Sequence, residues 1–316
     1  MPEKGEGLYT SPEESSFKSD KQIKYENLDS PILIREQTRG RKPSFYEWVD
    51  EFARRRDLKN NVEGLPEEVN IEIETNKPII IALLGDIHTG GHEVDYELLA
   101  HDIGFIASHP NAYVIGGGDL LEGFFFNPAQ DHQIATYNQQ RMFVRSMVDE
   151  IGHKKILFME CGDHDMWAER NGSTIYNEFG DETNIPIVRG STRTRIHLPN
   201  VEYKIVSAHC LPGHSIYNKS HPENRESKFG TQGADIYVGW HTHEKALAEQ
   251  VADQFDEEIR QLYISGGPYK YSDEYAQKKG WSKQRAKRRG AVWLVLTPFT
   301  KNAQAFYTAE EAERYL

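Results

Sequence analysis

Histidine and aspartate side chains gather in five short segments of the sequence. The segments are Gly85-Asp86-Ile87-His88, Gly118-Asp119, Gly162-Asp163-His164-Asp165, Ala208-His209 and His241-Thr242-His243. Carboxylate and imidazole ligands without thiolates suit Mn, Fe, Zn or Ni ions. Two such ions about 3.5–4 Å apart clamp the attacking and leaving oxygens of a phosphoryl displacement. The residue types therefore indicate a two-metal hydrolytic site that needs no serine, cysteine or threonine nucleophile.

Each of the five segments follows a run of apolar residues. The runs are Ile79–Leu84, Ala112–Ile115, Ile156–Met159, Tyr203–Val206 and Ile236–Val238. Apolar runs of this length next to glycine are typical of buried strands in a parallel or mixed sheet. Ligands of open α/β sheets gather at the carboxyl ends of the strands. We therefore expect side chains that are far apart in sequence to converge at one site.

The order of these segments resembles the signature of the calcineurin-like metallophosphoesterases. That signature runs D-x-H, G-D, G-N-H-D/E, H and G-H-x-H, and all five blocks occur here in order between Ile79 and Lys245. The resemblance implies an α/β fold, a β-sandwich of two mixed sheets flanked by helices, here with an N-terminal extension.

The resemblance also assigns roles to individual residues. It implies that Asp86, His88 and His243 hold one metal ion, and that His209, His241 and Asp163 hold the other. Asp119 would bridge both ions. His164 matches the non-ligand histidine that assists the leaving group, so it and Asp119 are the candidate catalytic residues. We expect two divalent ions, with Mn first and Fe, Zn, Ni or Mg as alternatives.

Two positions depart from the family signature. Asp163 stands where the family usually has Asn, and Trp240 separates Gly239 from the histidine pair. Neither change removes a metal ligand. The tryptophan is expected either to narrow the mouth of the pocket or to alter the loop.

Composition sets limits on the whole chain. The 316 residues carry a formal net charge of −12, which argues against broad binding to duplex DNA but does not exclude a nuclease. No apolar run approaches the ~20 residues of a membrane helix. The polar N-terminus has no signal-peptide core, and two cysteines make no disulfide framework. We expect a cytoplasmic protein. A weak likeness of residues 275–292 to bacteriophage members of the family would place it in the cytoplasm of a host cell.

Three regions are expected along the chain. Residues 1–43 read as an extended or disordered arm, residues 44–75 as a helical extension and linker, and residues 76–316 as the metallophosphoesterase domain. In the extension, Ser44 and Glu47 form a capping box, and the stripe from Phe45 to Phe52 lies on one helix face. That stripe either packs on the catalytic domain or docks a protein partner or a second subunit.

Alternating elements are expected within the domain. Residues 94–108 and 134–151 read as crossover helices. Residues 211–233 read as a long irregular segment, either a substrate loop at the pocket or a plain surface excursion.

Substrate contacts are expected from two further segments. The first runs from Phe124 to His132, where Phe125 could stack on a base and His132 could contact substrate. The second, Lys278–Arg289, holds seven basic residues and no acidic one, with Trp281, Arg285 and Arg288 as candidates for phosphate-backbone binding. Core packing of the phenylalanines and a solvated surface turn are the alternatives.

These features predict a metal-dependent phosphodiesterase that acts on nucleic acid or a nucleotide by attack of a metal-bridging hydroxide. One alternative is a phosphomonoesterase, such as a protein phosphatase, on the same fold. A second alternative is a non-catalytic interaction protein with a structural metal site.

Overall fold

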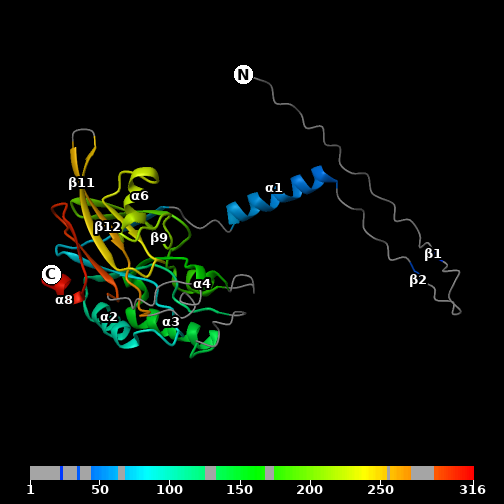
Figure 1. Cartoon of the computed structure of the whole chain (residues 1–316), viewed down its shortest axis with the longest axis horizontal. Helices are drawn as coiled ribbons and strands as arrows, with labels where there is room; N and C mark the ends of the chain where they lie inside the picture. Colours follow the sequence, from blue (N-terminus) through cyan, green and yellow to red (C-terminus); the bar gives the residue numbers. More distant parts are fainter. Residues whose placement is uncertain are drawn as a thin grey trace, which may run out of the picture. The chain divides into compact units, whose positions relative to one another are not determined.

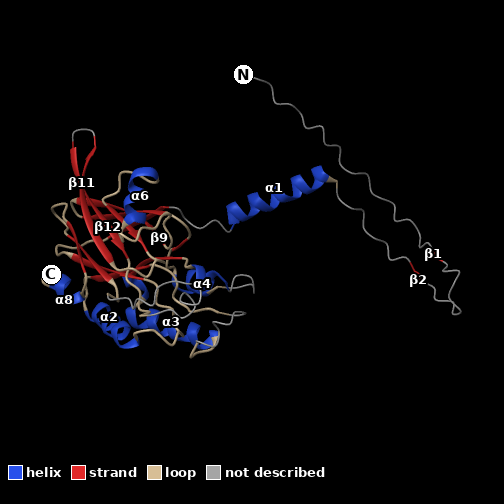
Figure 2. Cartoon of the chain, in the orientation of Figure 1, coloured by secondary structure: helices blue, strands red, loops and turns tan. Residues whose placement is uncertain are grey.

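The computed structural model describes residues 22–23, 34–35, 44–62, 68–124, 133–167, 174–254, 257–271 and 288–316. The chain forms two compact units, Met1–Gly64 and Leu65–Leu316. Figures 1 and 2 show their helices and strands. Each unit is described by itself.

Within its described residues, the first unit contains one helix and one short strand pair. Strands β1 (Gln22–Ile23) and β2 (Ile34–Arg35) pair antiparallel, and the rest of the predicted arm lies outside the described residues. Helix α1 (Phe45–Val62) starts as predicted: the Ser44 N–H donates to Glu47 Oε2 at 2.6 Å. The Glu47 N–H donates back to Ser44 Oγ at 3.3 Å. Partner binding through the Phe45–Phe52 stripe stays a prediction.

The second unit is built on two six-stranded mixed sheets. In spatial order, the first sheet contains β11 (Ala246–Gln254), β12 (Glu257–Ser265), β10 (Ile236–Gly239), β9 (Val201–Ala208), β8 (Thr192–Leu198) and β3 (Glu68–Glu72). The second contains β14 (Ala303–Phe306), β13 (Val292–Leu296), β4 (Ile79–Leu84), β5 (Ala112–Gly116), β6 (Ile156–Glu160) and β7 (Ile187–Val188).

The strands that precede the five His/Asp segments are neighbours in these sheets. Strands β4, β5 and β6 are parallel in one sheet, and β9 and β10 are parallel in the other. Their carboxyl ends therefore face the same way within each sheet, as the sequence predicted.

The core lies on both faces of the second sheet. Strand β4 has no exposed residue, and its side chains alternate between two apolar clusters because successive residues of a strand point to opposite faces. Ile79, Ile81 and Leu83 pack between the sheets, against residues such as Ile205 and Ile264 of the first sheet. Ile80, Ala82 and Leu84 pack with the helices that cover the outer face. The predicted sandwich of two mixed sheets flanked by helices is confirmed.

Helices flank the sheets, as Figure 2 shows. They are α2 (Tyr96–Ser108), α3 (Tyr137–Ile151), the 3-10 helix η2 (His153–Lys155), α4 (Asp163–Met166), α5 (Ile175–Thr183), α6 (His221–Phe229) and α8 (Ala309–Glu313). Helices α2 and α3 correspond to the two predicted crossover helices and begin at Asp95 and Thr136, whose side chains cap them.

Two segments differ from the expectation. Strand β3 lies inside the predicted linker, and it pairs with β8 from Glu68 to Glu72, so the second unit begins before residue 76. Helix α6 lies inside the predicted irregular segment. Its Pro222 stands in the first turn, where a missing N–H leaves no hydrogen bond unmade.

No helix among the described residues has the length and apolar character needed to cross a membrane.

Candidate metal centre

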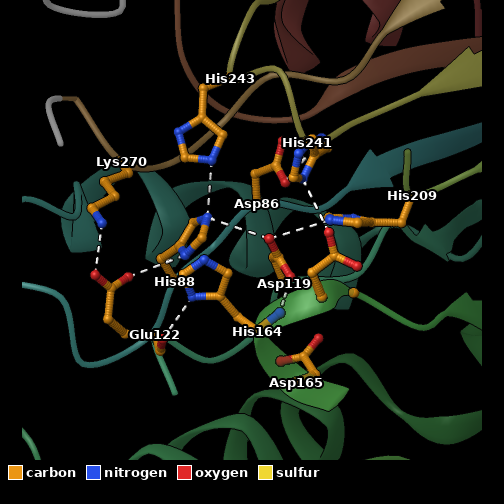
Figure 3. Close-up of polar contacts among 12 residues, drawn as sticks. Asp86, His88, Asp119, Glu122, His164, Asp165, His209, His241, His243 and Lys270 are labelled. Carbon is orange, nitrogen blue, oxygen red and sulfur yellow. Dashed lines mark hydrogen bonds and ion pairs between the residues drawn. The ribbon is translucent and has the colours of Figure 1, made fainter. Parts of the chain in front are cut away.

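The five predicted segments meet at one place, with Asp119 at its middle (Figure 3). Backbone hydrogen bonds join their loops: the Asp86 N–H donates to Gly118 O at 3.0 Å, and the His88 N–H to Asp119 O at 2.9 Å. The Trp240 N–H donates to His209 O at 3.1 Å. The His241 N–H donates to Asp86 Oδ2 at 2.9 Å, so segments from both sheets are held in a fixed relation before any ligand binds.

The backbone of the site is left-handed at five candidate ligands. The φ angles are positive at Asp86 (48°), His88 (53°), Asp119 (49°), His241 (69°) and His243 (54°). Outside glycine this conformation is uncommon and costs roughly 1–2 kcal/mol per residue. Such strain gathers where function requires a particular side-chain direction.

Trp240 forms the floor beneath these loops. Its indole is 1% exposed and lies against Gly85, Gly117 and Gly266. A Cβ at these three glycines would lie 2.6, 2.1 and 2.2 Å, respectively, from an indole atom, so only glycine fits. Of the two alternatives for Trp240, the buried indole contradicts a narrowing of the pocket mouth, because it fills the space that the glycines leave inside the core.

The first group of potential metal ligands consists of Asp86, His88 and His243. Their ligand atoms lie within 4.8 Å of one another. The two Nε2 atoms of His88 and His243 face each other at 3.0 Å. Burial lowers the pKa of both histidines, which favours the neutral form that binds metals.

The second group consists of Asp119, His209 and His241, again within 4.8 Å. His209 Nδ1 lies 2.7 Å from Gly117 O, which fixes the proton on Nδ1. His209 Nε2 is buried without a hydrogen-bond partner and lies 3.2 Å from Asp119 Oδ2. The same Oδ2 lies 3.8 Å from His88 Nε2, so Asp119 stands between the two groups as a bridging ligand would.

Asp163 lies at the open edge of the site. Its carboxylate is 3.7 Å from His241 Nδ1, its side chain is 61% exposed, and it belongs to none of the three tight clusters. The neighbouring Asp165 is buried and accepts the N–H groups of Leu120 and Leu121 at 3.0 and 2.8 Å. Asp165 thereby fixes the loop that carries Asp119.

His164 lies beside the two groups, and two neighbouring residues orient its ring. The third tight cluster joins it to His88 and Asp119. Its Nδ1 lies 2.7 Å from Glu122 O, which leaves Nε2 for a reacting group. Its ring stacks on Trp167, with centroids 4.1 Å apart, and Trp167 is 39% exposed.

The carboxylates and histidines of the site determine each other's protonation. Burial raises the pKa of Asp86 to about 8. Burial also pushes up the pKa of Asp119, but His209, His164 and His88 outweigh it and hold that pKa well below its usual range. These shifts belong to the metal-free protein, and a cation in the site would replace bound protons.

The donor set fits divalent metal ions. Imidazole nitrogens and carboxylate oxygens converge without thiolates, and the buried Nε2 of His209 lacks a hydrogen-bond partner. A cation would satisfy that atom, as well as the two imidazoles that face each other.

Four predicted substrate contacts, Phe125, His132, Trp281 and Arg285, lie outside the described residues. The fifth, Arg288, is exposed, and its guanidinium lies 4.3 Å from the centre of the Tyr307 ring. Phe124 is 5% exposed and packs near His164 and Trp167, which agrees with the packing alternative for that residue.

Three site residues were not predicted: Glu122, Lys270 and Trp167. Glu122 Oε2 lies 3.1 Å from His88 Nδ1, and Lys270 Nζ lies 2.7 Å from Glu122 Oε1. The only signal in the sequence is that Glu122 follows Asp119 by three residues and that Trp167 follows Asp165 by two. Lys270 follows no block and gives no such signal.

Comparisons with known proteins concern the fold. No protein-family model and no curated protein sequence matches the chain. Among solved structures, it is similar to a zinc-complexed Vps29 from Entamoeba histolytica, at 9% identity and a TM-score of 0.34, over 72% of this chain and 97% of that one.

Two further structures cover similar shares of the chain. A metallophosphoesterase from Sphaerobacter thermophilus matches at 13% identity and a TM-score of 0.35, over 75% of this chain and 92% of that one. A conserved uncharacterized protein from Streptococcus pneumoniae, described as a predicted phosphoesterase, matches at 12% and 0.31, over 73% and 99%. Because these sequence identities and TM-scores are low, the functional conclusion rests on the side chains of the site.

Proposed function

We propose that the protein is a two-metal phosphodiesterase that hydrolyses phosphate esters of nucleic acid or nucleotides. One observation carries the proposal. Asp119 Oδ2 lies between His209 Nε2 at 3.2 Å and His88 Nε2 at 3.8 Å, each part of a separate group of ligands. A single carboxylate oxygen between two such groups suits a pair of cations and not one structural ion.

The proposed ligand sets follow from this geometry. Asp86, His88 and His243 would hold one cation, His209 and His241 the other, with Asp163 at its open side and Asp119 shared. Two divalent ions held there would supply Lewis-acid stabilisation of the phosphate oxygens and a hydroxide nucleophile near neutral pH. Manganese is the proposed ion, because it suits the carboxylates of the site, and Fe or Zn, which suit its imidazoles, are the alternatives.

His164 is the proposed general acid. Its Nδ1 is engaged by Glu122 O, so a protonated ring presents its second N–H, on Nε2, to the site. As the phosphorus–oxygen bond breaks, this proton moves from Nε2 to the leaving oxygen, and His164 becomes neutral. Stacking on Trp167 keeps the ring in that direction.

The exposed ring of Trp167 favours a nucleotide substrate over a small phosphate ester without a base. It is an aromatic surface that packs on His164, the residue that faces the leaving group. Stacking of a base on an aromatic side chain contributes roughly 1–3 kcal/mol. A nucleotide leaving group could therefore bind Trp167 while its phosphate occupies the metal site.

The test measures turnover of three substrates by the protein loaded with Mn²⁺. The substrates are bis(p-nitrophenyl) phosphate, p-nitrophenyl phosphate and a short oligonucleotide. We expect two ions per chain, diester turnover above monoester turnover, and loss of both ions and turnover in Asp119→Ala. Faster monoester hydrolysis would favour the phosphatase alternative. Two bound ions without turnover on any substrate would favour a structural metal site.

A further inference from the structure

A buried ion pair adjoins the first group of ligands. Lys270 Nζ lies 2.7 Å from Glu122 Oε1, and their side chains are 5% and 2% exposed. Glu122 comes three residues after Asp119, and Lys270 lies on the segment that bridges to Val94. Figure 3 shows the pair on the side of His88 that faces away from Asp119.

If its only role were structural, this ion pair would make the protein less stable than a pair of apolar residues at the same positions. Removing two charges from water is expensive, and apolar residues of similar volume often serve a fold as well or better. A buried ion pair next to a cluster of ionisable groups therefore calls for a role beyond packing.

The second oxygen of Glu122 supplies that role. Glu122 Oε2 lies 3.1 Å from His88 Nδ1, on the opposite side of the ring from the atom that faces His243 Nε2 at 3.0 Å. Neither of the two buried atoms makes a hydrogen bond, so the carboxylate acts on the ring through its charge at this distance. A neutral imidazole carries one proton, on either nitrogen. A proton on Nε2 would point at His243 and block metal binding, whereas a carboxylate beside Nδ1 attracts the proton there.

We propose that Glu122 and Lys270 are positioning residues for His88. The Glu122 carboxylate holds the imidazole proton on Nδ1, so the lone pair of Nε2 faces the first metal ion. Lys270 donates to the other oxygen of that carboxylate at 2.7 Å and directs the carboxylate at the ring. This inference rests on the metal centre proposed above.

The other oriented histidines of the described site use a different partner. His209 and His164 each face a backbone carbonyl, Gly117 O and Glu122 O, through Nδ1. A carboxylate is a stronger acceptor than a neutral carbonyl. The device therefore acts on the first metal position alone, and it makes the two positions chemically unequal.

The test measures Mn²⁺ binding to the metal-stripped protein by calorimetry. In Glu122→Gln, we expect the affinity of one site to fall by about 10–100-fold, as is usual when a residue behind a ligand is changed. The other site should stay within about threefold. Glu223→Gln is the control for replacing a buried carboxyl group, because Glu223 is 1% exposed and contacts none of the candidate ligands in the described residues.

A double variant separates positioning from packing. Glu122→Leu with Lys270→Met removes both charges, so the melting temperature should approach or exceed that of the wild type. The weakened metal site should not recover, because no acceptor faces His88 Nδ1. The ¹⁵N chemical shifts of the His88 ring provide a second readout. They should report a proton on Nδ1 in the wild type and its movement to Nε2 in the double variant.

Each failure has its own signature. A wild type that binds no Mn²⁺ overturns the metal centre and this inference together. A wild type that binds two ions, with both variants binding them equally tightly and the same ring tautomer throughout, overturns the positioning role alone.

Discussion

At the scale of single residues, two contacts orient the ring of His164. The carbonyl of Glu122 engages Nδ1 at 2.7 Å, and Trp167 covers one face of the ring. His209, a proposed ligand, faces a carbonyl through Nδ1 in the same way, so this contact alone does not separate a ligand from a proton donor. In the role proposed above, His164 donates a proton and holds no metal ion.

Replacing His164 with Ala should therefore affect turnover and not metal content. We expect kcat to fall by about 10²-fold or more, as for loss of a general acid, with two ions still bound by elemental analysis. Trp167→Leu should cause a smaller loss, because the ring keeps its hydrogen bond. Loss of an ion in His164→Ala would show that His164 is a ligand.

Asp163 supports a second test at this scale. Its exposed carboxylate lies 3.7 Å from His241 Nδ1, where it would add negative charge beside the second ion. We expect Asp163→Asn to weaken the second site by roughly tenfold, equivalent to ~1.4 kcal/mol. Turnover at saturating Mn²⁺ should persist or rise, because a less neutralised ion is a stronger Lewis acid.

Metal titration followed by steady-state kinetics checks this expectation. An Asp163→Asn variant that binds both ions and does not turn over would contradict it. In that case the carboxyl group of Asp163 would be carrying out proton transfer.

At the scale of elements, the site depends on how closely the strand-end loops approach Trp240. A Cβ at Gly117 would lie 2.1 Å from the indole. We expect Gly117→Ala to destabilise the protein by about 1–3 kcal/mol, the usual range for overpacking. It should also weaken the second metal site, because Gly117 O orients His209.

Gly104→Ala is the matched control for this variant. Gly104 lies in α2 with no atom within 4 Å of an added Cβ. The exchange should stabilise the helix by about 0.5–1 kcal/mol. Urea denaturation measures both changes, and equal effects from the two glycines would refute the role of Trp240.

Helix α6 brings a carboxyl group into the core. Glu223 is 1% exposed, and burial raises its pKa from 4.5 to about 8. Between these values the folded protein holds a proton that the unfolded chain releases. Stability should therefore fall as pH rises through this window, by up to roughly 1.4 kcal/mol per pH unit.

Glu223→Gln should flatten that decline, as measured by urea denaturation at pH 5 to 8 in EDTA. Glu150→Gln, which removes an exposed carboxylate from α3, should leave the slope unchanged. If the stability of Glu223→Gln falls with pH as steeply as that of the wild type, the Glu223 carboxyl ionises in the folded protein as it does in the unfolded chain.

The helices and strands were predicted best where the residues that determine them are adjacent in the sequence. Apolar runs followed by Gly-Asp or His identified the strands and the ends at which ligands meet. The contact of Trp240 with three glycines was not predictable, because those glycines come from three separate loops. The pairing of Glu122 with Lys270 spans 148 residues and has no motif. Helix α6 was missed because its sequence, HPENRESKF, shows no apolar stripe.

At the scale of the whole molecule, the boundary between the two units allows a direct test. Val69 and Ile73 are 6% and 8% exposed and belong to the core between the sheets. A fragment of residues 65–316 should keep the stability and the model-diester activity of the full chain. A fragment of residues 76–316 loses both side chains and should be less stable by about 3–6 kcal/mol.

Thermal unfolding and turnover of the two fragments provide the measurements. Equal stability of both fragments would show that β3 is dispensable. Loss of activity in the 65–316 fragment would assign a catalytic role to residues 1–64. Their predicted role is the binding of a partner or a second copy through the Phe45–Phe52 stripe.

The left-handed backbone at five ligand positions also restricts which exchanges the chain can tolerate there. Gly, Asn and Asp enter this conformation easily, whereas a β-branched residue is an outlier in it. Substitutions that inactivate the site should therefore introduce mostly Asn, Asp or Gly, and rarely Val or Ile. This holds for the five positions with a left-handed backbone, which are Asp86, His88, Asp119, His241 and His243. Such intermediates keep the loop path after the metal is lost. An inactive descendant would then retain the shape of the centre, and a single exchange back to His or Asp could restore it.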